Sequence, residues 1–155
     1  MLHVETCRSH HIPEMALLYN QSFFRQWKPE DFQGFVCDDH DGFHKSHCNP
    51  KKAWGLFVND LLMGFILVHC VEDECEIITL CVCKKARRKG YASQLLSHIL
   101  SLPYALYSLE VNEHNQAAIG LYRRHGFQKI GSRQNYYRRK DGNFDSAFIF
   151  QYSKK

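Results

Sequence analysis

Apolar residues occur along the chain in short runs, and these runs predict most of its secondary structure. Alternating or continuous apolar runs predict strands at residues 2–8, 53–58, 61–71, 75–83, 105–111, 127–132 and 147–152. The second and third of these are joined by the turn-prone pair Asn59-Asp60, so they are expected to form a hairpin.

Apolar residues spaced three or four apart predict helices at residues 12–26, 90–101 and 116–124. Pro13 suits the first turn of the first helix, and Asn115 is a favourable N-cap for the last. Residues 27–32 interrupt the first helix and begin a shorter one. The polar, basic segment 133–143 lies between the last two predicted strands.

One strand–helix–strand unit stands out in this pattern. The strand at 75–83 is followed by a helix and then by the strand at 105–111, so these two strands are expected to be parallel neighbours. Open α/β sheets form their ligand crevice where such neighbours diverge beyond their carboxyl ends. A basic turn and Glu110 both fall at those ends, which predicts the functional site there.

The basic turn, Arg87-Arg88-Lys89-Gly90-Tyr91-Ala92, leads from the strand into the helix. Backbone N–H groups at a helix start are unpaired and lie at the positive end of the helix dipole, and glycine lets an anion approach them closely. A pyrophosphate fits such a turn, although a solvated helix start has the same composition. The turn is neither a Walker loop nor the three-glycine dinucleotide fingerprint.

The turn matches Arg/Gln-x-x-Gly-x-Gly/Ala, the coenzyme A pyrophosphate loop of the GCN5-related N-acetyltransferases, and the chain resembles this family. A second set of motifs resembles the ribosomal-protein-alanine N-acetyltransferases within it. These motifs are Leu109-Glu110-Val111, Asn115, Ile119, Leu121-Tyr122 and Gly126-Phe127, followed by Arg133, Asn135-Tyr136-Tyr137, Asp141-Gly142 and Asp145.

The resemblance implies one acetyltransferase domain over residues 1–155, of the α/β (α+β) class. Its fold would be a mixed, mostly antiparallel central sheet with one splayed parallel pair and helices on both faces. The chain departs from the family where Cys83-Lys84 replaces the usual Asp-Pro, and in the loop 37–52, which has no counterpart.

The resemblance also implies roles for individual residues. Glu110 would accept the proton of the attacking amine, Tyr122 would donate a proton to the thiolate, and Tyr136 and Tyr137 would lie near the acceptor peptide. Residues 24–35 would form a wall of the acceptor site. The residues implied to bind acetyl-CoA are Leu80, Cys81 and Val82 through their backbone, Arg88, Lys89, Gly90, Tyr91, Ala92 and Ser93 around the pyrophosphate, and Asn115 beside the pantetheine or adenylate.

Composition indicates which ligands the protein suits and in which compartment it works. Of the 155 residues 45% are hydrophobic, and the formal charge of +4 suits anionic ligands without demanding nucleic acid. Seven cysteines, an odd number, and the lack of a signal peptide favour free thiols in the cytoplasm, and no apolar run reaches the length of a membrane span. The loop 37–52 carries Cys37, His40, His44, His47 and Cys48, but their spacing is not that of a zinc finger, and we predict no metal.

The leading hypothesis is an acetyl-CoA-dependent acetyltransferase of the N-terminal amine, alanine by resemblance, of a ribosomal protein, acting as a monomer or dimer. One alternative keeps the fold and cofactor but acetylates a lysine, a polyamine or another small amine. Another is a non-catalytic module that binds acyl-CoA or the ribosome. Arg133 and the run Arg138-Arg139-Lys140 are either a ribosome contact or solvated surface charge.

Overall fold

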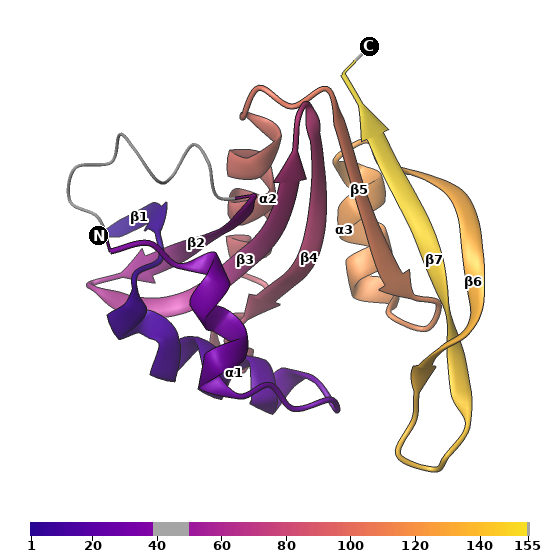
Figure 1. Cartoon of the computed structure of the whole chain (residues 1–155), viewed down its shortest axis with the longest axis horizontal. Coiled ribbons are helices and arrows are strands. Elements are labelled where there is room, and N and C mark those ends of the chain that lie inside the picture. Colours follow the sequence, from indigo (N-terminus) through magenta and orange to yellow (C-terminus); the bar gives the residue numbers. More distant parts are fainter. Residues whose placement is uncertain (39–49, 155) are drawn as a thin grey trace.

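The computed structural model describes residues 1–38 and 50–154 (Figure 1). The strands are β1 (Leu2–Thr6), β2 (Lys51–Val58), β3 (Leu61–Val71), β4 (Glu74–Val82), β5 (Leu106–Asn112), β6 (Gln128–Arg138) and β7 (Phe144–Ser153). The α-helices are α1 (Ile12–Ser22), α2 (Tyr91–Leu100) and α3 (Gln116–Arg124), and the 3-10 helices are η1 (Ser9–His11), η2 (Pro29–Phe35) and η3 (Lys84–Ala86). No helix within these two ranges is long and apolar enough to cross a membrane.

The described strands form one mixed sheet in the order β1-β2-β3-β4-β5-β7-β6. Every neighbouring pair in it is antiparallel except β4 and β5, which α2 connects as a crossover. The predicted fold class, mostly antiparallel with a single parallel pair, is therefore confirmed.

The parallel pair separates towards its carboxyl ends. β4 and β5 are paired only from Glu74 opposite Leu106 to Ile77 opposite Leu109, and Figure 1 shows them diverging beyond that point. The rest of β4 stays paired with β3, and the rest of β5 stays paired with β7. The backbone of β4 from Ile78 to Val82 thus has no strand on the β5 side, so its N–H and C=O groups on that side can bind a ligand.

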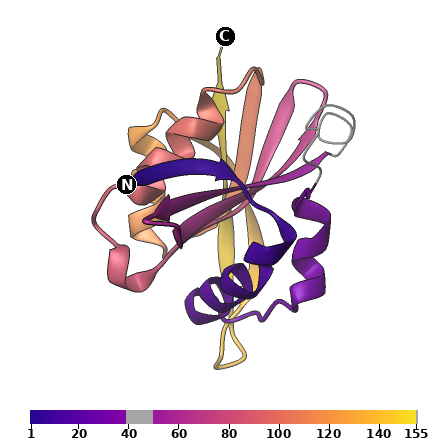
Figure 2. The same cartoon turned by 90° about the vertical axis from the view of Figure 1, so that its left-hand side faces the viewer.

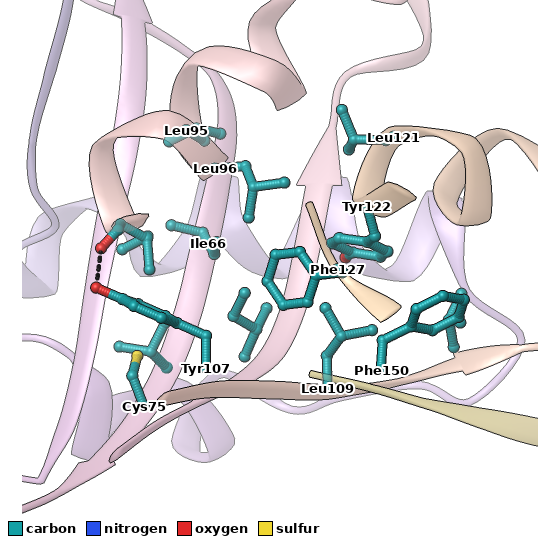
Figure 3. Close-up of a cluster of buried hydrophobic side chains, with 14 of the residues drawn as sticks. Ile66, Cys75, Leu95, Leu96, Tyr107, Leu109, Leu121, Tyr122, Phe127 and Phe150 are labelled. Carbon is teal, nitrogen blue, oxygen red and sulfur yellow. Dashed lines mark hydrogen bonds between the residues drawn. The ribbon is translucent and has the colours of Figure 1, made fainter. Parts of the chain in front are cut away.

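Helices cover both faces of the sheet, as expected (Figure 2). On one face, α2 and α3 pack against buried residues of β3, β4 and β5. Tyr107 on β5 ties this layer to the sheet, because its hydroxyl donates to the carbonyl oxygens of Ile99 at 2.7 Å and Leu102 at 2.9 Å. Figure 3 shows one of these two bonds. On the other face, α1 and η2 bury Met15 and Phe32 completely against the sheet.

The first helix is shorter than predicted, because it ends at Ser22 and not near Gln26. Phe23 is extended, and the Asn20 side chain holds the chain that follows it. Asn20 Nδ2 donates to the Trp27 carbonyl at 2.9 Å, and Asn20 Oδ1 accepts from the Trp27 N–H at 2.8 Å. These two bonds turn the chain back before Pro29 begins η2.

The strand predicted at residues 127–132 is longer in the structure, where β6 runs from Gln128 to Arg138. β6 continues to Arg138, which pairs with Phe144 at the start of β7. β6 is an edge strand with mostly exposed side chains, so its sequence lacks the apolar alternation that predicts a strand. Its register shifts between Arg133 and Tyr137, where Asn135 has a φ of 55°.

The Cys/His-rich loop was predicted to begin at Cys37 and to bind no metal. His40, His44, His47 and Cys48 lie outside the described residues. β2 begins at Lys51, two residues earlier than the apolar run indicated.

Candidate active site

The turn predicted to bind pyrophosphate forms the N-terminal end of α2, which has no side-chain cap. Gly90 is the N-cap residue in the left-handed conformation, with a φ of 78°, and Arg88 shares that conformation with a φ of 67°. No side chain caps the helix, its first turn contains no acidic residue, and the first intrahelical bond runs from the Gln94 N–H to the Gly90 carbonyl at 3.0 Å. The N–H groups of the first turn therefore have no capping side chain and are available to bind an anion.

Space and charge around this turn also suit an anion. A Cβ atom at Gly90 would meet nothing within 4 Å, so the site is open and glycine is required there by its backbone conformation. The basic residues Arg87, Arg88 and Lys89 are exposed around it. Ala86, almost fully buried, anchors the turn to the body of the protein.

Ser93 connects this turn to the end of α3, a contact that the sequence did not predict. Its Oγ lies 2.7 Å from Nε2 of His125, the C-cap residue of α3. Burial, with a smaller contribution from Arg124, lowers the pKa of His125. The imidazole is therefore neutral at physiological pH and orients the Ser93 hydroxyl. No motif spacing in the sequence relates positions 93 and 125.

The predicted acyl-binding segment Leu80-Cys81-Val82 lies on the unpaired part of β4. Cys81 directs its side chain to the α1 face, where its Sγ lies 3.4 Å from the Leu18 carbonyl oxygen and 3.5 Å from Ser22 Oγ. Since the side chain of Cys81 is buried there, only its backbone can contact a ligand between the strands.

Glu110 lies on β5 just beyond its last pairing with β4. Its side chain is 19% exposed, and its Oε1 lies 3.0 Å from Arg133 Nε on β6. A hydrogen bond to the Glu110 carboxylate is the main cause that raises the pKa of the Tyr136 phenol. An arginine and a tyrosine from the same edge strand thus hold the carboxylate at the point where the strands diverge.

Tyr122 on α3 is only 6% exposed, and its ring lies 5.5 Å from that of Phe127 between centroids (Figure 3). Burial, with a smaller contribution from Tyr137, raises the pKa of Tyr122 far above its usual 10. The phenol is therefore protonated at any physiological pH, and it can act as a proton donor.

Tyr137 connects the two predicted catalytic residues. Burial, then its neighbours Tyr136, Glu110 and Tyr19, raise the pKa of its phenol. Tyr137 on β6 thus interacts electrostatically with side chains of β5, α3 and α1. No motif in the sequence marked Tyr19 as part of the site.

Asn115 occupies the predicted N-cap position of α3. Its Oδ1 accepts a hydrogen bond from the Ala118 N–H at 3.2 Å, and its side chain is exposed. The cap uses the oxygen of the amide and leaves its NH₂ group for another partner, so helix capping and a ligand contact are compatible.

Residues 24–35 border a cavity of about 350 Å³ beside the sheet. Arg25, Trp27 and Asp31 line it from the helical side, and Ile78 lines it from the unpaired part of β4. Phe24, next to this segment's cavity-lining residues, has Lys140 Nζ of the β6–β7 turn 6.0 Å from its ring centroid. The α1–η2 connection and the β6–β7 turn therefore approach each other at this pair.

The basic residues of β6 and the β6–β7 turn are partly neutralised by nearby acids. Arg139 NH2 lies 2.9 Å from Asp141 Oδ2, and Arg139 NH1 lies 3.7 Å from Asp145 Oδ1. Glu113, His114 and Asp145 place one oxygen or nitrogen atom each within 4.8 Å of one another. Hydrogen bonds from Asn112 to Asp145 and from the Ser146 N–H to Glu113 explain this group as a junction between β5 and β7.

The family model that matches residues 12–127 is described as the acetyltransferase (GNAT) family. The chain belongs to the acetyltransferase (GNAT) family. Enzymes of this family use acetyl-CoA as the acyl donor, so the predicted transferase class and co-substrate are confirmed at the level of the family.

Two relatives are similar in sequence over part of their length. The chain is 32% identical over 94 residues to the [ribosomal protein bS18]-alanine N-acetyltransferase of Haemophilus ducreyi, covering 58% of this chain and 65% of that protein. It is 38% identical over 102 residues to the uncharacterised protein ML0378 of Mycobacterium leprae, covering 61% of this chain and 28% of that protein. The matches thus span less than two thirds of these curated relatives.

Solved structures share the fold over nearly the whole chain. The ribosomal-protein-S18-alanine N-acetyltransferase from Escherichia coli has a TM-score of 0.85 at 23% identity, covering 99% of this chain and 94% of that one. NAA60 of Arabidopsis thaliana in complex with acetyl-CoA has a TM-score of 0.81 at 18% identity, covering 99% of both chains.

Proposed function

We propose that residues 1–155 form one acetyltransferase domain that transfers the acetyl group of acetyl-CoA to the N-terminal α-amine, alanine in the first instance, of a ribosomal protein. The observation that carries this proposal is the cluster of Glu110, Tyr122, Tyr136 and Tyr137 where β4 and β5 diverge, beside the open start of α2. The acceptor class is supported by the printed names of the relatives from H. ducreyi and E. coli.

Acetyl-CoA would enter between β4 and β5 with its pyrophosphate on the N–H groups at the start of α2. Arg88, Lys89 and Gly90 would surround the phosphates, with Tyr91, Ala92 and Ser93 in the first helical turn. The pantetheine would run along the backbone of Leu80, Cys81 and Val82 as an added strand does, with the Asn115 amide donating to it. The acetyl group would then lie between Glu110 and Tyr122.

Transfer requires the ammonium to lose a proton and the departing thiolate to gain one. Glu110 would accept the first proton, directly or through water, while Arg133 and Tyr136 hold its carboxylate. Tyr122 would donate the second proton to the coenzyme A sulfur. An α-amine has a pKa of about 7.7–8.0, against about 10.4 for lysine, so it demands less of a single carboxylate base.

The acceptor peptide would approach between residues 24–35 and the β6–β7 turn, with Tyr136 and Tyr137 beside its first residues. In this proposal the enzyme works in the cytoplasm, as a monomer or dimer. Because Arg133 and Arg139 already pair with acids of the same domain, a ribosome contact would rest mainly on Arg138 and Lys140.

Two peptides separate this proposal from a lysine or small-amine acetyltransferase. One carries a free N-terminal alanine in a ribosomal-protein sequence, and the other has the same sequence with a blocked N-terminus and an internal lysine. Mass spectrometry after incubation with acetyl-CoA should show one acetyl group added to the first peptide alone. Modification of the second would contradict α-amine specificity, and modification of neither would favour a module that binds without turnover.

A further inference from the structure

Two cysteines face each other across the β3–β4 hairpin, away from the proposed active site. Cys70 and Cys75 are register partners on either side of the turn at Glu72-Asp73, and their sulfur atoms lie 3.3 Å apart. Both are buried, with exposed fractions of 8% for Cys70 and 1% for Cys75. Neither residue takes part in the proposed transfer.

The backbone places these residues in the closer of the two kinds of antiparallel pair. The Cys70 N–H donates to the Pro50 carbonyl on the β2 side at 2.6 Å, so it does not bond across to β4. Cys70 and Cys75 are therefore a non-hydrogen-bonded pair, whose Cα atoms typically lie about 4.5 Å apart with the side chains close together. That separation falls within the range of about 4.4–6.8 Å that a disulfide spans.

The surroundings distinguish the two sulfur atoms chemically. The close contact with the Cys75 sulfur, together with the Tyr104 hydroxyl and the charge of Lys52, lowers the pKa of Cys70 despite its burial. The contact with Cys70, followed by burial and the charge of Glu76, raises the pKa of Cys75, and Tyr107 packs against it in the core (Figure 3). Cys7 shows the opposite behaviour, because burial and Glu5 raise its pKa to about 12.

We propose that Cys70 and Cys75 form a peroxide-reactive dithiol that closes to a reversible cross-strand disulfide. The Cys70 thiolate attacks one oxygen of hydrogen peroxide, the O–O bond breaks, and hydroxide leaves as a sulfenic acid forms. The Cys75 sulfur then attacks the Cys70 sulfur, the S–O bond breaks, and a second hydroxide leaves with the Cys75 proton as water. Two thiols lose two electrons in total, and the peroxide is reduced to two molecules of water.

The dithiol lies on the strand that would carry the acyl group, at its opposite end. At about 3.3 Å per residue, Cys75 is about 17 Å along β4 from Leu80. Oxidation is therefore expected to change the acetylation rate less than twofold. The inference goes beyond the proposed function, and its readout is a covalent bond, so either proposal can fail without the other.

The test treats the full chain with hydrogen peroxide under native conditions, then unfolds it in iodoacetamide. Cleavage at Asp73 and Lys84 separates residue 70 from residue 75, so the two peptides stay joined only through a disulfide. We expect the two peptides to be joined by a bond that dithiothreitol reduces. We also expect Cys7, Cys81 and Cys83 to be alkylated. Full alkylation of Cys70, or equal linkage of Cys70 to Cys81 or Cys83, would overturn the proposal.

Two variants test the order of the steps. Cys75→Ser should leave a sulfenic acid on Cys70 that dimedone labels, whereas Cys70→Ser should leave Cys75 unlabelled. Labelling of Cys75 alone would reverse the assigned roles and contradict the proposal. Circular dichroism checks that both variants are folded. The disulfide test on the unmodified chain does not depend on either variant.

Discussion

At the scale of single residues, what distinguishes the proposed active site is how its acidic and phenolic groups are held. Arg133 and Tyr136 bind the Glu110 carboxylate from one edge strand, while the core that raises the pKa of Tyr122 keeps its phenol protonated. The proposed base and the proposed acid thus lie in opposite environments, one polar and partly open and the other apolar and closed.

Tyr122→Phe should lower the acetylation rate by about 10²-fold or more, because it removes the proposed proton donor and leaves the ring in place. Stability should fall by no more than about 1 kcal/mol, and acetyl-CoA affinity should not change. The rate with an alanine peptide, calorimetric binding and urea unfolding together measure these effects.

Tyr107→Phe is the matched control, since Tyr107 is another buried tyrosine of the same core. It loses the bonds to the Ile99 and Leu102 carbonyls, so stability should fall by about 1–2 kcal/mol while the rate stays near that of the unmodified chain. Equal rate losses in the two variants would show that Tyr122 acts only through packing.

At the scale of elements, the sequence predicted those parts of the structure that local patterns determine. β3 and α3 have the predicted bounds, and the α2 start follows from the glycine and the basic residues before it. The continuation of β6 and the bulge at Asn135 depend on pairing with β7, a long-range contact that leaves no periodic pattern in an exposed strand. For that reason Glu110 and Tyr122 were identifiable by motif, whereas the contacts of Glu110 with Arg133 and Tyr136 were not.

Asn115 has two proposed roles at the start of α3, as helix cap and as acetyl-CoA contact, and two variants separate them. Asn115→Ala should lose about 1 kcal/mol of stability with the cap, and it should also raise the KM for acetyl-CoA. Asn115→Ser keeps an oxygen that caps the helix but has no amide, so stability should be retained while the KM still rises. An unchanged KM in both variants would limit Asn115 to capping.

At the scale of the whole molecule, buried and partly buried histidines make the stability of the fold depend on pH. Burial lowers the pKa of His11, His98 and His125 below the ordinary 6.5. Among the described residues, His98 Nε2 is a buried side-chain nitrogen without a hydrogen-bond partner, on a ring packed 5.6 Å from Trp54. Below pH 6.5 the unfolded chain takes up protons that the folded chain does not, so stability falls as the pH falls from 6.5 towards the lowered pKa values.

His98→Phe removes one of these groups and keeps an aromatic ring against Trp54. The free energy of unfolding should therefore decline less between pH 7.5 and pH 5.5, chosen to lie about one unit on either side of the histidine pKa, than in the unmodified chain. Urea unfolding at several pH values measures both slopes. Parallel slopes would show that His98 does not contribute to the acid sensitivity.

The central claim is that Glu110 accepts the proton of the amine at the point where β4 and β5 diverge. The most direct measurement compares Glu110→Gln with the unmodified chain, using calorimetric binding of acetyl-CoA and the rate of acetyl transfer to an alanine peptide. We expect unchanged acetyl-CoA affinity and a rate at least about 10²-fold lower, partly recovered at high pH where the amine is already neutral. Transfer at the unmodified rate would contradict it.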